Sequence, residues 1–354
     1  MALTPCLTRG HSWGTIGMTK SIVVTGGAGF IGAHVVRYLT EVCDDDIVII
    51  DKLSYAGHLG RLSDVLVLPR VHFYQEDVCD TAKMSTLLAK HQPWAIMHLA
   101  AESHVDRSID APTVFLHNNI QGTQSLLQAA LGYWQALPDN LQAAFRYLQV
   151  STDEVFGDAE DNGYAAHEDS PYRPSSPYSA SKASADHWVQ SYQRTFGLPT
   201  LISYCSNNYG PGQFPEKLIP LSIERIKNGE TIPVYGDGLQ KRDWLYVVEH
   251  ARALWLMLTK AEPNQCYVVA AGQPITNLQL LQALYLEVQK QLNRPVNEVP
   301  IQFVTDRLGH DRCYSLDASK IKRELGWHEQ TLLQDGLAAT VHQALNAPLL
   351  VTEK

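Results

Sequence analysis

The chain has 354 residues, of which 45% are hydrophobic and 18% are charged. This composition excludes a disordered or fibrous protein, and the length suits two modest domains or one large domain with an appended lobe. The formal net charge of −9 repels phosphate backbones, so we expect no nucleic-acid partner. No apolar run is long enough to span a membrane, so we expect no membrane partner either.

The N-terminal stretch does not have the apolar core of a secretion signal, because Pro5, Arg9 and Gly14 interrupt it. We therefore expect residues 1–18 to be a disordered or non-native extension, and residues 347–354 to be a tail. The six cysteines form no Cys-x-x-Cys pair and are expected to be reduced thiols. Reduced thiols favour a cytoplasmic location.

Strands and helices alternate through the first two hundred residues. Short β-branched or apolar runs predict strands at 21–25, 46–50, 71–74, 94–99, 146–150 and 201–205. Apolar periodicity predicts helices at 31–39, 111–137 and 179–196, the last of them closed by Gly197. This alternation predicts an α/β fold built on a doubly wound parallel sheet of the Rossmann type.

The second half of the chain has a looser pattern. Residues 156–177 are rich in turn formers and are expected to form a surface loop over the active face. After residue 205 prolines and glycines become frequent, which is typical of binding loops. Helices are predicted at 217–228 and 278–292, in a smaller lobe.

The segment after the first predicted strand contains Gly26, Gly29 and Gly32, in the spacing Gly-x-x-Gly-x-x-Gly. Such glycines allow a tight turn and a close approach of the backbone to a pyrophosphate, which the start of a helix favours. Asp51 stands about 20 residues further on, where an acid binds ribose hydroxyls and repels a ribose phosphate. The pattern therefore predicts a site for NAD rather than NADP, with Asp77-Val78 beside the adenine.

Tyr178 and Lys182 lie four residues apart at the start of a predicted helix, so that they share one face. A neighbouring ammonium lowers the pKa of a phenol, which makes the tyrosine a usable base. Thr152, Asp153 and Glu154 follow a strand at the edge where parallel sheets bind ligands, and could bind a reacting hydroxyl and exchange protons. Alternatively, the tyrosine and lysine share a face by chance, and the acids cap a turn or face water.

Together, these residues resemble the nucleotide-sugar branch of the extended short-chain dehydrogenases/reductases. Within that branch, Asp153 and Glu154 after Thr152 resemble the dTDP-glucose 4,6-dehydratase family. The resemblance covers roughly residues 20–346. Its further segments are 51–57 (DKLSYAG), 98–109 (HLAAESHVDRSI), 151–157 (STDEVFG), 174–182 (PSSPYSASK), 205–211 (CSNNYGP), 214–220 (FPEKLIP), 242–247 (RDWLYV) and 309–312 (GHDR).

The resemblance implies an NAD-dependent hydro-lyase that converts dTDP-glucose into dTDP-4-keto-6-deoxyglucose and water, for deoxysugar synthesis such as that of dTDP-rhamnose or for cell-surface polysaccharide precursors. Tyr178, with Lys182 and Thr152, would remove the proton of the C4 hydroxyl while hydride passes to NAD. Glu154 would take the C5 proton, and Asp153 would protonate the departing C6 hydroxyl. Hydride would return to C6, so NAD should stay bound between turnovers.

The resemblance also implies the binding residues. The cofactor contacts of the family match Gly26, Gly29, Phe30, Ile31, Gly32, Asp51, Lys52, Leu53, Ser54, Asp77, Val78, Leu99, Ala100, Ala101, Ser103, Asn118, Tyr178, Lys182 and Asn208. The substrate contacts match Ser103, Thr152, Asn207, Lys217, Leu218, Pro233, Val234, Tyr235, Arg242, Asn277, His310 and Tyr314. Arg242 suits a pyrophosphate, although a surface ion pair with Asp243 would explain it equally well. No His/Cys cluster is evident, so no metal is expected.

On this interpretation, residues 19–204 plus about 241–272 form the NAD-binding domain. Residues from about 205–240 plus 273–346 form the smaller α/β lobe that binds the nucleotide sugar. In the family, helices such as 111–137 and 179–196 pair across a two-fold axis as a four-helix bundle, so a homodimer is expected.

Other activities fit parts of the pattern. The first alternative is another enzyme of the same branch: a 4-epimerase, a decarboxylase or another dehydratase. The second, from a different class, is a catalytically silent NAD-binding sensor. An epimerase needs no acid and base beyond the tyrosine and lysine, so Asp153 and Glu154 argue against it. A silent sensor predicts that catalytic side chains have been lost, whereas all five are present. The choice of dTDP over other nucleotides rests on the resemblance.

Overall fold

The structure, a computed structural model, describes residues 20–346, so the predictions for residues 1–18 and 347–354 lie outside it. Its larger part is a seven-stranded sheet with the order β11-β6-β5-β4-β1-β2-β3, in which all neighbouring strands are parallel. The strands are β1 (Ser21–Thr25), β2 (Asp46–Ile50), β3 (Val71–Tyr74), β4 (Ala95–His98), β5 (Arg146–Thr152), β6 (Thr200–Cys205) and β11 (Gln265–Val269). The chain winds outward from β1 in both directions, which confirms the predicted doubly wound α/β fold.

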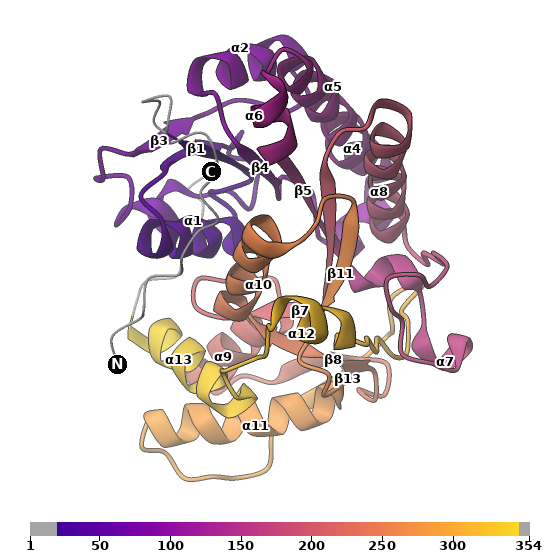
Figure 1. Cartoon of the computed structure of the whole chain (residues 1–354). Helices are drawn as coiled ribbons and strands as arrows, with labels where there is room; N and C mark the ends of the chain where they lie inside the picture. Colours follow the sequence, from indigo (N-terminus) through magenta and orange to yellow (C-terminus); the bar gives the residue numbers. More distant parts are fainter. Residues whose placement is uncertain (1–19, 347–354) are drawn as a thin grey trace.

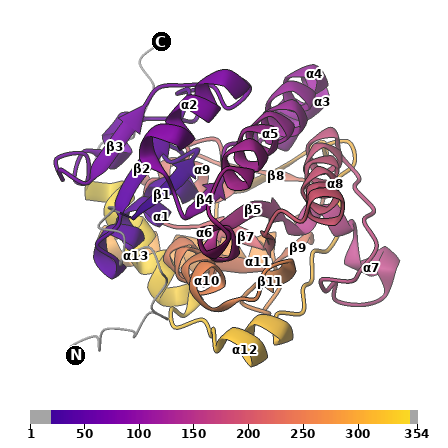
Figure 2. The same ribbon diagram turned by 45° about the horizontal axis from the view of Figure 1, so that its top comes forward.

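Helices cover both faces of this sheet, as Figures 1 and 2 show. On one face α2 packs against α5 and α5 against α8, and on the other α1 packs against α10. Both faces of the central strands are therefore buried, which explains why they are apolar runs rather than alternating patterns. The bounds are α1 (Phe30–Val42), α2 (Thr81–His91), α5 (Gly122–Gln135), α8 (Pro177–Phe196) and α10 (Val247–Lys260).

The predicted helix 111–137 is helical but not uniform. Pro112 opens the short α4 (Pro112–Phe115), and a π-helical segment, η3 (Leu116–Gln121), joins it to α5. The wider π turn carries Asn118 and Asn119, which are buried. Such segments often occur at functional sites. A further short helix, α3 (Val105–Asp110), precedes them and was not predicted.

The smaller part of the molecule lies below the sheet in Figure 1. It contains three helices, α9 (Leu218–Asn228), α11 (Asn277–Gln291) and α13 (Leu333–Asn346), packed on one another. Three two-stranded pairs accompany them: β7 (Asn207–Tyr209) with β10 (Trp244–Tyr246), β8 (Ile232–Tyr235) with β13 (Ile301–Val304), and β9 (Lys241–Arg242) with β12 (Ile275–Thr276). The remaining short elements are η2 (Leu59–Leu62), α6 (Asp139–Ala144), η4 (Asp153–Phe156), α7 (Ala159–Asn162) and α12 (Ser319–Leu325).

Two hydrophobic clusters correspond to these two parts. The larger surrounds the sheet, and the smaller is formed by α9, α11 and α13 with β8. Ile321 and Trp327, from within the range predicted for the smaller lobe, belong to the larger cluster. The domain boundaries stay a prediction.

Residues 156–177 were predicted to form a loop, and most of them do, although α7 interrupts the segment. Within residues 20–346, no helix has both the length and the apolar character that crossing a membrane requires. Five cysteines lie in that range, and all five are unpaired.

Candidate active site

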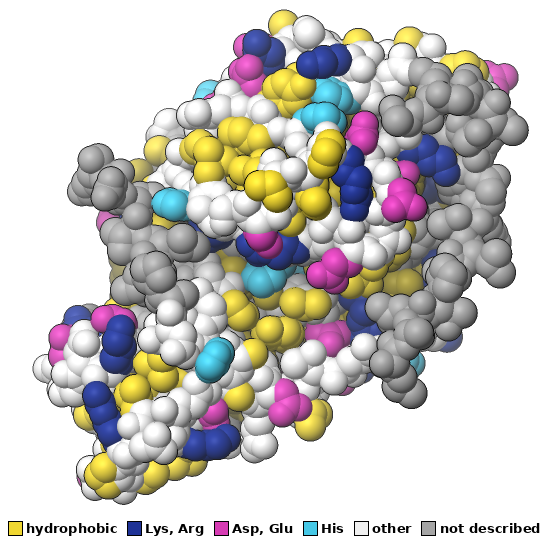
Figure 3. Space-filling model, turned by 90° about the vertical axis from the view of Figure 1, so that its left-hand side faces the viewer, with side chains coloured by type: hydrophobic (Ala, Val, Ile, Leu, Met, Phe, Trp, Pro, Cys, Tyr) yellow, Lys and Arg dark blue, Asp and Glu magenta, His cyan; other side chains and the backbone are white. Residues whose placement is uncertain are grey.

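A cavity of about 560 Å³ lies along the carboxyl ends of the central strands and continues into the smaller part of the molecule. Gly26 after β1, Asp51 after β2 and Leu99 after β4 line it on one side. Val234 of β8 and Asn277 of α11 line it on the other. The face drawn in Figure 3 is hollowed between its upper and lower parts, with acidic and basic side chains interspersed around the hollow. The cavity therefore lies where open α/β sheets bind ligands.

All but one of the residues predicted for the cofactor, the substrate or catalysis line this cavity. The exception is Leu53, which was predicted to contact the cofactor. Its backbone turns at a φ of +56°, its amide donates to Asp51 Oδ1 at 2.8 Å, and its side chain packs against the large hydrophobic cluster. Leu53 therefore helps to hold Asp51 instead of facing the cavity.

The glycine turn leaves open a space that side chains at its glycine positions would fill. Gly26 has a φ of +71°, and a Cβ there would lie 2.6 Å from the Ala100 nitrogen. A Cβ on Gly32 would collide with the Gly26 carbonyl oxygen. The Asp51 carboxylate braces the turn, since its Oδ2 accepts a hydrogen bond from the Ala28 amide at 3.0 Å. The bare backbone beside a helix start fits the pyrophosphate of a dinucleotide.

A polar network lines the same side of the cavity. Lys52 Nζ donates to Asn118 Oδ1 at 2.6 Å and lies 3.3 Å from Asp77 Oδ2. Asn118 also donates to Glu102 at 3.2 Å. The π-helical segment turns Asn118 inward to meet both partners. Lys52, Asp77 and Asn118 are predicted cofactor contacts, whereas Glu102, which lies in the 98–109 segment, is not.

The start of α8 places the tyrosine and the lysine. Ser176 and Ser179 form a reciprocal cap, each hydroxyl accepting a hydrogen bond from the backbone amide of the other, so that the helix begins just before Tyr178. One turn later, Lys182 Nζ donates to the Val150 carbonyl oxygen of β5 at 2.7 Å. Both side chains line the cavity.

Burial dominates the pKa of both side chains, so the lowering of the Tyr178 pKa by Lys182 stays a prediction. Burial raises the pKa of Tyr178 well above its usual value, and the neighbouring Glu154 adds to this shift. Burial also lowers the pKa of Lys182. The ammonium is engaged by a backbone carbonyl, and desolvation of the phenol is the larger effect.

The two acids after β5 differ in their surroundings. Thr152 Oγ1 donates to Asp153 Oδ1 at 3.1 Å and accepts a hydrogen bond from the Glu154 amide at 3.3 Å. Burial, reinforced by the Glu154 charge, raises the pKa of Asp153 to about 8. Burial also raises the pKa of Glu154, but Arg307, Arg242 and Lys217 oppose the shift. At neutral pH Asp153 therefore carries a proton that it can donate.

Several polar atoms at the cavity have no partner within residues 20–346. They include Asp153 Oδ2, Asn207 Oδ1 and Asn277 Oδ1, all of which are buried. Buried polar atoms are costly unless they are hydrogen-bonded, so a polar ligand would satisfy them. These atoms fit the hydroxyls of a sugar or the polar groups of a nucleotide.

The alternative reading of Arg242 as a surface residue paired with Asp243 is wrong. Arg242 is 5% exposed, donates to the Asp311 carbonyl oxygen at 2.8 Å, and stacks 4.2 Å from the centroid of the Tyr314 ring. Asp243 instead accepts hydrogen bonds from the Gly272 and Gln273 amides. Arg242 is thus held at the cavity by neutral groups, which leaves its charge available for an anion.

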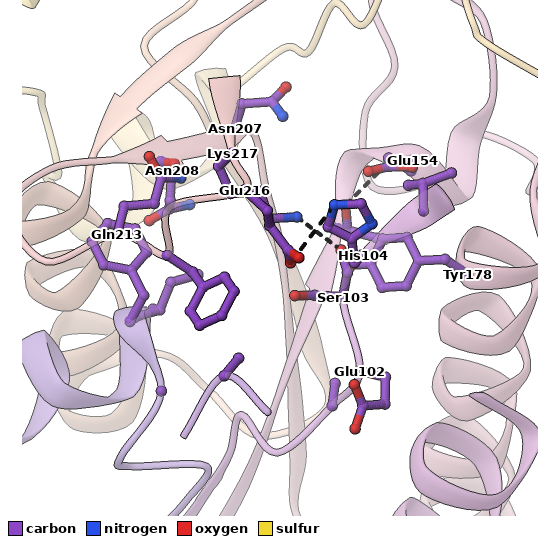
Figure 4. A pocket seen from close by; sticks show the side chains of 18 of the residues that line it. Glu102, Ser103, His104, Glu154, Tyr178, Asn207, Asn208, Gln213, Glu216 and Lys217 are labelled. Atoms are coloured by element: carbon purple, nitrogen blue, oxygen red, sulfur yellow. Dashed lines mark hydrogen bonds and ion pairs between the residues drawn. The ribbon is translucent and has the colours of Figure 1, made fainter. Parts of the chain in front are cut away.

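Further charged residues at the cavity were not predicted individually. Figure 4 shows His104 in contact with Glu216, and Lys217 beside Ser103. His104 Nε2 lies 3.6 Å from Glu216 Oε1. Both belong to segments that carry the family resemblance, which was the available indication, whereas nothing in the sequence singled out Arg307.

The comparisons with known proteins agree with this geometry. Residues 23–340 match the family model described as GDP-mannose 4,6 dehydratase. The chain is 48% identical to a dTDP-glucose 4,6-dehydratase of Neisseria gonorrhoeae, covering 92% of this chain and 96% of that one. It is 46% identical to dTDP-glucose 4,6-dehydratase 1 of Escherichia coli K12, covering 92% of each.

Solved structures show the same similarity. DesIV of Streptomyces venezuelae, a dTDP-glucose 4,6-dehydratase crystallised with NAD and dTDP, has a TM-score of 0.82 and 41% identity, covering 91% of this chain and 96% of that one. A UDP-glucose 4-epimerase of Thermus thermophilus in complex with NAD has a TM-score of 0.80 but only 27% identity, covering 93% and 100%. The chain therefore belongs to the dTDP-glucose 4,6-dehydratases, within the family that the GDP-mannose 4,6 dehydratase model describes.

Proposed function

We propose that the protein converts dTDP-glucose into dTDP-4-keto-6-deoxyglucose and water, with NAD as a bound cofactor. The observation that carries this proposal is the pair of acids, the buried Asp153 and the half-buried Glu154, at the cavity that also holds Tyr178 and Lys182. Identity to curated dehydratases along nearly the whole chain, and NAD in the solved relatives, support it. The product would serve deoxysugar synthesis.

The cofactor would lie against the glycine turn, with Asp51, Lys52 and Asn118 as its further contacts. When bound, NAD supplies a hydride acceptor for the sugar C4 and a hydride donor for C6. Tyr178 takes the proton of the C4 hydroxyl, which Thr152 positions by a hydrogen bond. Lys182 contributes a positive charge to the phenolate that forms.

The elimination step requires an acid and a base on neighbouring carbons. A ketone at C4 acidifies the C5 proton, and Glu154 accepts this proton. Asp153 donates its own proton to the departing C6 hydroxyl, which leaves as water. Its raised pKa, about 8, keeps that proton available at neutral pH.

A proton NMR time course tests the function. The purified protein is incubated with dTDP-glucose without added NAD, beside a matched sample with UDP-glucose. We expect the 4-keto-6-deoxy product from dTDP-glucose alone, which also indicates a retained cofactor. A galactose-configured product would instead identify an epimerase. No product from either sugar after NAD is added would contradict the proposal.

We also infer that the protein is a homodimer that works in the cytoplasm. Leu116 of η3 is 56% exposed and Trp188 of α8 is 41% exposed, and together with Ile120 they line a shallow hollow on the helical face. The neighbouring helices α5 and α8 pack side by side. Pairing of these helices with those of a second copy, as a four-helix bundle, would cover the apolar side chains. The unpaired cysteines within residues 20–346 support a reducing compartment.

A further inference from the structure

Residues 211–217, here called the strap, join β7 to α9 and belong to the smaller part of the molecule. At one end the strap is fastened beside the glycine turn. His34 of α1 forms a hydrogen bond of 2.9 Å with the Pro211 carbonyl oxygen, and Arg61 Nε donates to the Gly212 carbonyl oxygen at 3.0 Å. Arg61 also donates to the Ala28 carbonyl oxygen within the turn, at 3.3 Å. This end of the strap is therefore tied to the glycine turn.

The other end is fastened through Glu216. Tyr55, from the loop after β2, donates to Glu216 Oε1 at 3.1 Å. His104 Nε2 lies 3.6 Å from the same oxygen, and Arg107 Nε lies 3.6 Å from Oε2. The Arg107 guanidinium in turn stacks 3.8 Å from the centroid of the Tyr55 ring. One carboxylate thus joins the strap to the loops that follow β2 and β4.

Neighbouring contacts reinforce this junction. Lys217 Nζ donates to the Ser103 carbonyl oxygen at 3.1 Å, and Figure 4 shows it beside the His104–Glu216 contact. The Phe214 ring meets the Tyr55 ring edge-on, with centroids 5.4 Å apart. Phe214, Glu216 and Lys217 line the same cavity as the glycine turn. A dinucleotide in the cavity would lie between the turn and the strap.

The proposed reaction explains why the bound cofactor should be enclosed. Hydride leaves the sugar in the first step and returns to it in the last, so loss of the reduced cofactor in between would abort the cycle. The strap can move away from the glycine turn only if the contacts at its two ends break. Glu216 is its main charged contact at the far end, and its side chain is only 21% exposed.

We propose that Glu216 is a positioning residue that fastens the strap over the bound NAD and slows its release. The role given to Glu216 rests on the proposed function, whereas the contacts that Glu216 makes do not depend on it. Glu216 acts through Tyr55, His104 and Arg107, all of which stand on the cofactor side of the cavity.

The test measures how fast NAD leaves the purified, NAD-loaded protein, with no sugar present. Glu216→Gln keeps the size of the side chain and an acceptor for Tyr55, but it removes the charge that attracts Arg107. We expect NAD to leave about three- to tenfold faster, because partly exposed ion pairs each contribute modestly. We also expect wild-type release to accelerate with salt, and the variant to lose most of this dependence. Activity without added NAD should fall and be restored by adding NAD.

Glu230→Gln is the matched control. It removes a carboxylate from an exposed pair with Arg225, 2.7 Å long, just beyond α9 and away from the cavity. Release from this variant should equal that of the wild type. Arg107→Gln removes the opposite charge and should accelerate release as Glu216→Gln does, which keeps the test decisive if one variant fails to fold.

Unchanged release and unchanged salt dependence in Glu216→Gln and Arg107→Gln would overturn the inference. So would an equal acceleration in Glu230→Gln. Because the release measurement contains no sugar, its result is independent of whether the protein dehydrates dTDP-glucose.

Discussion

Asp153 and Glu154 are adjacent in the chain, yet the structure gives them different tasks. Asp153 is 3% exposed, its Oδ2 has no partner among the described residues, and its pKa is raised to about 8. Glu154 is also desolvated, but three cationic side chains offset part of the effect. A protonated Asp153 beside a Glu154 whose charged form is favoured by nearby cations can serve as acid and base in one reaction.

The first prediction concerns the acid. A general acid must be protonated, so the elimination rate should fall as the pH rises through about 8, where Asp153 loses its proton. Asp153→Asn cannot donate this proton and should slow elimination by about 10²–10⁴-fold. Product formation by NMR at several pH values, together with the affinity for dTDP measured by calorimetry, provides the test.

The second prediction concerns the base. Glu154→Gln should slow removal of the C5 proton by a similar factor, about 10²–10⁴, while dTDP binds nearly as well as to the wild type. Exchange of the C5 proton with deuterated water reports this step directly. Nucleotide affinity that falls as steeply as the rate, in either variant, would show that these acids bind the substrate and do not move protons.

Tyr178 shows what a sequence pattern can and cannot predict about a residue. The four-residue spacing correctly indicates that Tyr178 and Lys182 face the same cavity, because helix geometry alone decides this. The pKa of Tyr178 also depends on desolvation and on Glu154, which come from the tertiary fold. For the same reason, the sequence did not distinguish a buried Arg242 from a surface ion pair.

Among the secondary elements, the glycine turn and the start of helix α1 depend on the absence of side chains. The turn returns so closely on itself that a Cβ on Gly32 would collide with the Gly26 carbonyl oxygen. At Gly29 the nearest atom is the same oxygen, but it would be 3.2 Å from the new Cβ. Neighbouring glycines of one motif therefore differ in what they tolerate.

The third prediction follows from this difference. Gly32→Ala should force the turn open and weaken NAD binding by at least about tenfold, whereas Gly29→Ala should have a smaller effect. Gly132→Ala, in α5, is the control, since a Cβ there meets nothing within 4 Å and alanine favours a helix. NAD titrations of the three variants provide the measurement. Equal losses for Gly32→Ala and Gly29→Ala would contradict the steric argument.

The elements that could be predicted are those whose burial imposes a recognisable pattern of apolar residues on the sequence. The central strands are covered on both faces, so their apolar runs located six of the seven strands of the large sheet within two residues. Pairs such as β9 with β12 are only two residues long and carry no recognisable period. Tyr55 and Glu216, which meet in the strap contacts, are 161 positions apart in the sequence, so only the fold brings them together.

At the scale of the whole molecule, one cavity is shared between two hydrophobic clusters. The larger cluster supports the glycine turn and the acids after β5, and the smaller supports α9, α11 and β8. Cofactor and sugar nucleotide would thus be held by parts with separate cores. Contacts such as Tyr55 with Glu216 and Tyr235 with Asp106, at 3.2 Å, cross between them. These contacts hold the two parts in place around the cavity.

The last prediction concerns assembly. Helix α8 carries Tyr178 and Lys182 near its start and the exposed Trp188 further along, so a partner packed on Trp188 would brace the catalytic helix. A glutamate at the centre of an apolar interface is costly to desolvate, so Trp188→Glu should convert the expected dimer into a monomer at micromolar concentration. Phe303→Glu is the control, because Phe303 is 54% exposed on β13, away from the helical face. Sedimentation velocity should give a dimer for the wild type and the control. A wild-type protein that sediments as a monomer would refute the dimer, and the apolar side chains of η3 and α8 would then need another partner.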